Sequence, residues 1–378
     1  GCSPITALVP ATNQQPVPYP DAMMSPLARS LAVITVAATT AATLVACGSA
    51  ASPKPSDSSG SSGRAVVLVS GLATQTPYTT PNSACVEGLA AGNSVTALRA
   101  SLRAAGNRVY TAPAQSGPGE VAETGGFGPS TKCPDPLPAS MTIDTTGSIN
   151  DGGQNLSTFL TYLNTAFGIT KVDLVGHSMG GLFARSAIKT LKDSSSPVTI
   201  RSLTTLSSPW TGTYPADYAT GKLPISACLN QPQCVQVLNG YKKLAQEEGP
   251  RGAASVISTE ALQGPSGWNS RQAGALSGIP VTLIGGNYFT RPGGIPAVWP
   301  NDAIVALDSA LATNLPDAAL PHRSCLTRPD VHTIALADEF KLTWESAITW
   351  DPVVLGAVND AVKNADTALS KPNRQGCP

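Results

Sequence analysis

The sequence predicts an α/β fold with a mostly parallel central sheet and helices on both of its faces. A continuous apolar run rich in β-branched residues, typical of a strand that is covered on both faces, occurs at residues 65–69. Further strand runs come at 172–175, near 200–206 and at 280–285. An apolar stripe with helical spacing lies between the first two runs. Strand and helix therefore alternate, which favours a parallel sheet with right-handed connections.

That stripe predicts one helix between the first two strands. Its apolar residues follow the i, i+3, i+4, i+7, i+11 spacing of a single helix face, namely Leu156, Phe159, Leu160, Leu163 and Phe167. Gly168 comes next, and glycine commonly ends a helix because it adopts the left-handed conformation without strain.

The first 63 residues are not expected to belong to this fold. Residues 31–46 are uncharged and apolar but shorter than the roughly 20 residues of a spanning helix, so they indicate an export signal. Since Met23 and Met24 precede them, we expect an upstream extension at 1–22 and a signal peptide at 23–47. Residues 48–63 are nearly all Gly, Ser, Ala and Pro and predict a flexible tether, which leaves 64–378 as the working domain.

Composition narrows the class of function. Lys and Arg total 24, Asp and Glu total 24, and the net charge is zero, so a nucleic-acid partner is not expected. The eight cysteines stand singly, without a CxxC pair or a Cys/His cluster, which argues against a metal site. This usage favours disulfides formed outside the cytosol, and we expect an exported protein.

Two stretches are too long to be plain connections. Residues 111–138 are dense in Gly and Pro and contain Cys133, so we expect a surface loop pinned by a disulfide. Residues 213–278 are long enough for a helical insertion with its own hydrophobic face, and their place between two strands makes them a candidate lid.

The segment 176–181 carries the strongest chemical signal. Its sequence Gly-His-Ser-Met-Gly-Gly directly follows the strand at 172–175 and opens a segment with apolar residues at helical spacing. Strand, tight turn and helix form a nucleophile elbow, with Ser178 at its tip. Such a turn is strained and requires small neighbours, which accounts for Gly176 and Gly180.

The helix start beneath Ser178 predicts half of an oxyanion hole. The main-chain N–H of Met179 is one expected donor, because helix amino termini present free N–H groups. The second is expected from the loop after the first strand, where the N–H of Leu72 or Ala73 is the candidate and Gly71 allows close approach.

A serine nucleophile needs a base and an acid. Of the three histidines, His177 lies beside the elbow, where a structural role is expected, which leaves His322 and His332. We favour His332, because it stands directly before an expected helix, whereas His322 lies close to an arginine and to a cysteine that is expected in a disulfide. The acid should precede the histidine in the chain.

Three aspartates could supply that acid. Asp302 follows a Pro-Asn turn in front of an apolar run, a loop position from which a carboxylate reaches an imidazole. Asp308 and Asp317 are the alternatives, and the small and apolar neighbours of Asp308 indicate a helix with Asp308 on its solvated face. We therefore favour Asp302.

These residues resemble bacterial secreted lipases and esterases of the α/β-hydrolase superfamily. Residues 171–182 look like the elbow of that family, 206–212 are similar to its next strand end, and 301–305 and 331–333 resemble its acid and histidine segments. The resemblance covers about residues 64–365. The chain differs from the family pattern at three places, with Ser70-Gly71 in place of His-Gly, Trp210 in place of His and Ala303 in place of Gly.

The resemblance implies an α/β-hydrolase fold and a carboxylic ester hydrolase, a triacylglycerol lipase or an esterase. Ser178 would attack the ester, His332 would move the proton, Asp302 would orient His332, and no cofactor would be needed. The alternatives are an envelope acyltransferase with the same acyl-enzyme and a non-catalytic binding protein on this scaffold. A monomer acting on a lipid or another ester is expected.

Cysteines give two further expectations. Residues 44–47 look like the lipobox of bacterial lipoproteins, which would make Cys47 a lipid anchor and the protein either an envelope lipoprotein or, with an ordinary signal, a secreted one. Sequence order alone suggests three disulfides, which are Cys85 with Cys133, Cys228 with Cys234, and Cys325 with Cys377.

Overall fold

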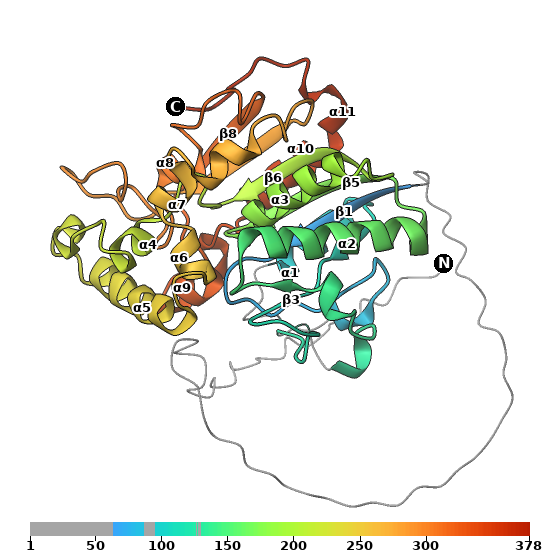
Figure 1. Cartoon of the computed structure of the whole chain (residues 1–378), viewed down its shortest axis with the longest axis horizontal. Coiled ribbons are helices and arrows are strands. Elements are labelled where there is room, and N and C mark those ends of the chain that lie inside the picture. The colour runs from blue at the N-terminus through green and yellow to red at the C-terminus, as the bar shows by residue number, and fades with distance from the viewer. Residues whose placement is uncertain (1–62, 87–94, 126, 128–129) are drawn as a thin grey trace, which may run out of the picture. The chain divides into compact units, whose positions relative to one another are not determined.

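The central sheet has six strands in the order β2-β1-β5-β6-β7-β8, and every neighbouring pair is parallel (Figure 1). The computed structural model describes residues 63–86, 95–125, 127 and 130–378. The strands are β1 Arg64–Val69, β2 Val109–Thr111, β5 Lys171–His177, β6 Thr199–Leu206, β7 Val281–Gly286 and β8 Arg323–Arg328, and a separate pair is formed by β3 Ala114–Gln115 and β4 Ile143–Asp144. The expected parallel sheet is confirmed, and the four predicted strands are β1, β5, β6 and β7.

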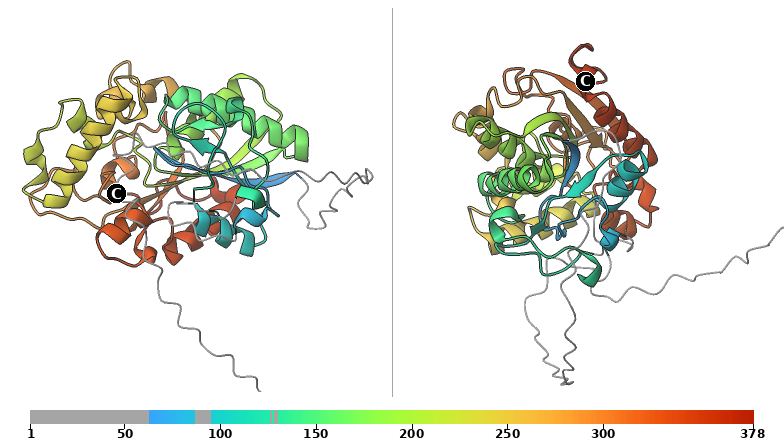
Figure 2. Two further views of the ribbon diagram at one scale, coloured as in Figure 1. Left: turned by 90° about the horizontal axis from the view of Figure 1, so that it is seen from below. Right: turned by 90° about the vertical axis from the view of Figure 1, so that its right-hand side faces the viewer.

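Helices cover both faces of this sheet (Figure 2). Val67 and Val69 of β1 lie in one core with α2 Ile149–Phe167 and α3 Gly180–Asp193. Val66 and Leu68 lie in a second core with α1 Thr96–Ala104 and α10 Pro352–Lys363. Successive side chains of a strand point to opposite faces, so a continuous apolar run buries both faces of β1.

The helix predicted between the first two strands is α2, and its end is the expected one. Gly168 caps it in the left-handed conformation, with φ of 68°. Phe167 is 38% exposed, so the buried face ends before the last residue of the predicted stripe. Its ring packs instead against Tyr110 and Tyr162 near the surface.

The insertion at 213–278 is helical, and it is part of the same fold. It contains α4 Tyr214–Ala219, α5 Pro232–Glu248, α6 Ala253–Val256 and α7 Thr259–Gln263. Ala253, Leu262 and Trp268 are buried in the core that also holds α2 and α3. The expected separate hydrophobic face belongs to α4 and α5, and the loop before α8 Leu307–Ala310 completes it through Trp299.

Short helices fill the remaining connections. They are α9 Ile334–Glu339 and α11 Ala365–Ala368, with the 3-10 turns η2 Ala84–Val86, η3 Ser130–Lys132, η4 Ala139–Met141, η5 Ile225–Cys228, η6 Trp268–Gln272 and η7 Trp344–Ser346.

Two of the three expected disulfides are present. Cys228 bonds to Cys234 inside the insertion, and Cys325 of β8 bonds to Cys377 near the end of the chain. The expected pair of Cys85 and Cys133 is wrong, because both are free thiols. Burial and the neighbouring Cys85 raise the pKa of Cys133 to about 12, which favours its thiol form.

The expected extension, signal peptide and lipid anchor at Cys47 lie outside the described residues, as does most of the tether. Gly63, which we assigned to the tether, belongs to the domain, because its carbonyl oxygen accepts hydrogen bonds from the N–H groups of Thr170 and Lys171. Among the helices of the described ranges, none is both long enough and apolar enough to cross a bilayer.

Candidate active site

Ser178 occupies a strained turn between β5 and α3. Its φ is 54°, a conformation that non-glycine residues rarely adopt and that is concentrated at functional sites. A Cβ on Gly176 would lie 2.6 Å from the main-chain nitrogen of Gly181, and a Cβ on Gly180 would overlap the carbonyl oxygen of Val69. The turn therefore needs both glycines that the sequence analysis selected.

The loop after β1 closes against this turn. A Cβ on Gly71 would lie 2.7 Å from the Cβ of Ser178 and 3.0 Å from the main-chain nitrogen of Met179. The chain leaves β1 for β2 on one side and returns to β5 on the other, so the two loops meet where the strand order reverses. Open parallel sheets bind their ligands at this point, outside the carboxyl ends of the strands.

Two N–H groups at this meeting point are free. In the part of the chain that the structure describes, neither Leu72 nor Met179 donates a hydrogen bond from its main-chain nitrogen. Met179 directly precedes α3, whose amino end carries a partial positive charge. The two residues expected to form an oxyanion hole thus have N–H groups available for a ligand.

His332 and Asp302 form a buried pair. The ring Nδ1 of His332 lies 2.7 Å from Oδ2 of Asp302, and the two residues are 4% and 0% exposed. Asp302 lies in the loop after β7 and His332 in the loop after β8. Because β7 and β8 are parallel neighbours, their carboxyl ends bring these loops together.

Asp302 is held as an anion. Its Oδ1 accepts hydrogen bonds from the main-chain N–H groups of Ile304 and Val305 at 3.0 and 2.8 Å. Burial raises the pKa of this carboxyl, but the nearby His332 and the hydrogen bonds from Ser207 and Val305 outweigh burial, and the pKa lies below its usual value. A carboxylate with this environment fixes the proton of His332 on Nδ1.

The alternative base and acids lie elsewhere. The ring of His322 contacts the carbonyl oxygen of Lys371 at 3.2 Å. Asp317 pairs with two arginines, Arg323 and Arg374. Asp308 is half-buried in α8, and burial raises its pKa. Within the described ranges, none of these three residues forms a hydrogen bond or an ion pair with Ser178, Asp302 or His332.

Two further polar residues contact Asp302 or His332, and the sequence did not predict these contacts. Ser207 directly follows β6, has a φ of 47°, and its hydroxyl reaches Asp302. His177 was expected to be structural, and its Nε2 lies 2.9 Å from the carbonyl oxygen of His332. The position of Ser207, immediately after a parallel strand as Ser178 is, was the signal available in the sequence.

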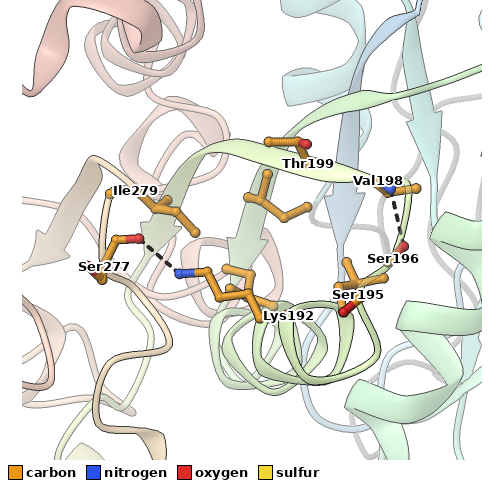
Figure 3. A pocket seen from close by; sticks show the side chains of 11 residues that line it. Lys192, Ser195, Ser196, Val198, Thr199, Ser277 and Ile279 are labelled. Carbon is orange, nitrogen blue, oxygen red and sulfur yellow. Dashed lines mark hydrogen bonds between the residues drawn. The ribbon is translucent and has the colours of Figure 1, made fainter.

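A cavity of about 350 Å³ lies at the opposite edge of the sheet, between the end of α3 and the starts of β6 and β7. Figure 3 shows Lys192 in it, and the ammonium of Lys192 donates to the carbonyl oxygen of Ser277 at 2.9 Å. This cavity faces the amino ends of the strands, so it is separate from Ser178, Asp302 and His332. Within the described residues, no group of His, Cys, Asp or Glu is arranged to hold a metal.

One family model and several solved structures are similar to parts of this chain. Residues 155–223, from α2 to the turn after α4, match the family model of the PGAP1-like alpha/beta domain. No curated protein matches the chain. The solved lipase BlEst2 of Bacillus licheniformis, in its mature form, is 15% identical over 81% of this chain and 96% of its own, with a TM-score of 0.44.

Two solved esterases are similar in the same way. A thermophilic esterase from Thermogutta terrifontis is 14% identical over 81% of this chain and 92% of its own, with a TM-score of 0.40. The esterase Pf2001 of Pyrococcus furiosus is 12% identical over 81% of this chain and 84% of its own, with a TM-score of 0.41. With its parallel sheet, its helices on both faces and its serine turn between β5 and α3, the chain has the α/β-hydrolase fold that the resemblance implied.

Proposed function

We propose that the protein is a carboxylic ester hydrolase, a lipase or an esterase, that works through Ser178, His332 and Asp302. The observation that carries the proposal is the buried hydrogen bond between His332 and Asp302, combined with a serine in a strained turn at the carboxyl edge of the same sheet. These are the three residue types and the chain order that a serine hydrolase of this fold requires.

The chemistry follows from the protonation states. Asp302 keeps the proton of His332 on Nδ1, so Nε2 of His332 is the free base. Nε2 takes the hydroxyl proton of Ser178 while Oγ attacks the ester carbonyl, and it then gives the proton to the leaving alcohol. Nε2 next takes a proton from a water molecule whose oxygen attacks the acyl-enzyme, and it gives that proton to Oγ of Ser178 as the acyl bond breaks, which releases the acid.

Negative charge develops on the carbonyl oxygen during both steps. The unpaired N–H groups of Met179 and Leu72 are the proposed donors to it, and the amino end of α3 adds a favourable potential. Gly71 supports this assignment, because a side chain there would collide with Ser178 and Met179. Removal of one such donor typically slows turnover by about 10²- to 10³-fold.

A neutral ester with an apolar acyl part is the proposed substrate class. The chain has no net charge to attract an ionic substrate, and both His332 and Asp302 are shielded from water. Triacylglycerols and simpler esters fall in this class. Acyl esters of p-nitrophenol with short and long chains are therefore suitable probes.

The test compares the wild-type chain with Ser178→Ala. We expect the wild type to release p-nitrophenol and free acid, and we expect Ser178→Ala, with an unchanged circular dichroism spectrum, to release neither. An added alcohol separates hydrolysis from acyl transfer, since transfer yields the new ester in place of the acid. Equal release by both proteins would contradict the proposal.

We also propose that the protein is exported and anchored through an acylated Cys47. The support is the apolar run at 31–46 that ends in this cysteine. Expression with a fatty-acid analogue is expected to label the wild type and not Cys47→Ser, and equal labelling of the two would contradict the anchor.

A further inference from the structure

His177 contacts the base through the main chain. The side chain is 2% exposed, and its Nε2 lies 2.9 Å from the carbonyl oxygen of His332. A carbonyl oxygen only accepts, so Nε2 carries the proton and donates it. Nδ1 of His177 is then unprotonated, and it has no partner in the described part of the chain.

The imidazole of His177 is uncharged. Burial, followed by the charge of the nearby His332, lowers the pKa of His177 to about 3, against the opposing effects of the contact with the carbonyl oxygen of His332 and of Asp302. His332 and Asp302 are the titratable groups that act on His177 among the described residues. The two imidazole rings have centroids 4.8 Å apart, so a charge on His177 would oppose the positive charge that His332 acquires during the reaction.

Two other polar groups of His332, its main-chain N–H and its ring Nδ1, are held by one residue. Its main-chain N–H donates to the carbonyl oxygen of Asp302 at 2.9 Å, and its ring Nδ1 bonds to the carboxylate of Asp302 at 2.7 Å. The carbonyl oxygen remains, and His177 holds it. His177 directly precedes Ser178, so one strand end sets the position of both the nucleophile and the base.

We propose that His177 is a positioning residue, whose Nε2–H fixes the peptide of His332 so that its ring remains aimed at Ser178. The proposal rests on the proposed function, because it assigns to His332 the role of base. It goes beyond the structural role that a histidine beside an elbow was expected to have. Through this hydrogen bond to the main chain of His332, His177 can set the position of the His332 ring without itself contacting the substrate.

The test uses two substitutions that differ in one property. His177→Phe keeps a planar ring of similar size but has no donor, whereas His177→Gln places an amide N–H near the position of Nε2. We expect kcat of His177→Phe to fall roughly 10- to 100-fold with KM within about twofold, because a displacement of about 1 Å in a catalytic group costs up to about 10²-fold. We expect His177→Gln to recover kcat to within about threefold of the wild type.

Controls separate this proposal from the proposed function and from loss of folding. Ser178→Ala tests the ester hydrolase itself, and His322→Phe makes the same change at a histidine away from the pair. His177→Leu repeats the loss of the donor in a smaller side chain, and each variant's kcat is compared after its circular dichroism spectrum and Tm are measured. The proposal would be overturned if folded His177→Phe and His177→Leu had the kcat of an active wild type. It would also be overturned if folded His177→Gln were as slow as His177→Phe.

Discussion

The main-chain N–H of His332 donates to the carbonyl oxygen of Asp302 at 2.9 Å, while the ring Nδ1 of His332 lies 2.7 Å from the carboxylate of the same residue. The two residues are thus joined through both main chain and side chain. A ring that is held in this way cannot turn without breaking a buried, charge-assisted hydrogen bond. The base of the proposed reaction is therefore fixed before any substrate arrives.

Replacement of the two candidate histidines distinguishes them. His332→Ala removes the group that bonds to Asp302, and we expect kcat to fall by about 10⁴- to 10⁶-fold. His322→Ala is the matched control, because among the described residues the ring of His322 is hydrogen-bonded to the carbonyl oxygen of Lys371 and not to the proposed catalytic residues, and its kcat should stay within about twofold. Ester hydrolysis measures both, and the reverse order of the two losses would reject His332 as the base.

Substitution of Asp302 should lower kcat far more than substitution of Ser207. Asp302→Asn keeps the shape of the side chain but presents an N–H group to Nδ1, which favours the wrong tautomer, and we expect kcat to fall by about 10⁴-fold. Ser207→Ala removes one hydrogen bond from a carboxylate that has other donors, so a loss of about 10-fold or less is expected. The kinetics would contradict this account if Ser207→Ala were the more damaging change.

Gly71 should tolerate no side chain. Gly71→Ala would place a Cβ 2.7 Å from the Cβ of Ser178, so we expect kcat/KM to fall at least about 10-fold as the loop shifts. Gly356→Ala is the control, because a Cβ on Gly356 in α10 meets nothing within 4 Å and alanine favours a helix. Wild-type kcat/KM in Gly71→Ala would show that the two loops are not in contact.

Asp330 should make stability depend on pH. It is 3% exposed, and burial followed by the charge and hydrogen bond of Asp351 raises its pKa to about 8, against the opposing effect of Arg328. The pKa of Asp330 in the folded protein is above the unfolded value of about 3.9, so protonated Asp330 favours the folded state. This contribution to the free energy of unfolding is complete below about pH 4 and is lost as pH rises to about 8. The wild type should therefore become less stable over that interval.

Asp330→Asn tests this titration. Asparagine still donates to Asp351 but has no proton to lose, so at pH 9 we expect the variant to be more stable than the wild type by about 1–3 kcal/mol. The difference should be smaller at pH 5. Thermal unfolding at the two pH values measures it, and an equal difference in Tm at both would contradict the assignment to Asp330.

The strands β1, β5, β6 and β7 could be predicted because they are buried on both faces and are rich in apolar and β-branched residues. The edge strands β2 and β8 could not be predicted in this way. β2 Val109–Thr111 has only three residues, and β8 Arg323–Arg328 contains two arginines and only one large aliphatic residue, so neither has an apolar run. Pairing with a neighbouring strand, rather than local sequence, determines these two edges.

Ser178 was selected from the sequence because its turn follows a strand end and opens a helix. Asp302 was selected for its turn before an apolar run, and His332 for its place after the acid and before an expected helix. The contact of His177 with the carbonyl oxygen of His332 could not be selected, since it joins residues 155 positions apart through a main-chain atom. The free thiols of Cys85 and Cys133 were missed because sequence order contains no information on burial or protonation.

The most direct test of the central claim is the intact mass of the protein after treatment with a fluorophosphonate. Such a probe bonds covalently to a serine that a neighbouring base activates. We predict one adduct per chain, located on Ser178 by peptide mapping, with no adduct in Ser178→Ala and strongly slowed labelling in His332→Ala. An unlabelled wild type, or a Ser178→Ala variant labelled as fast as the wild type, would contradict the account.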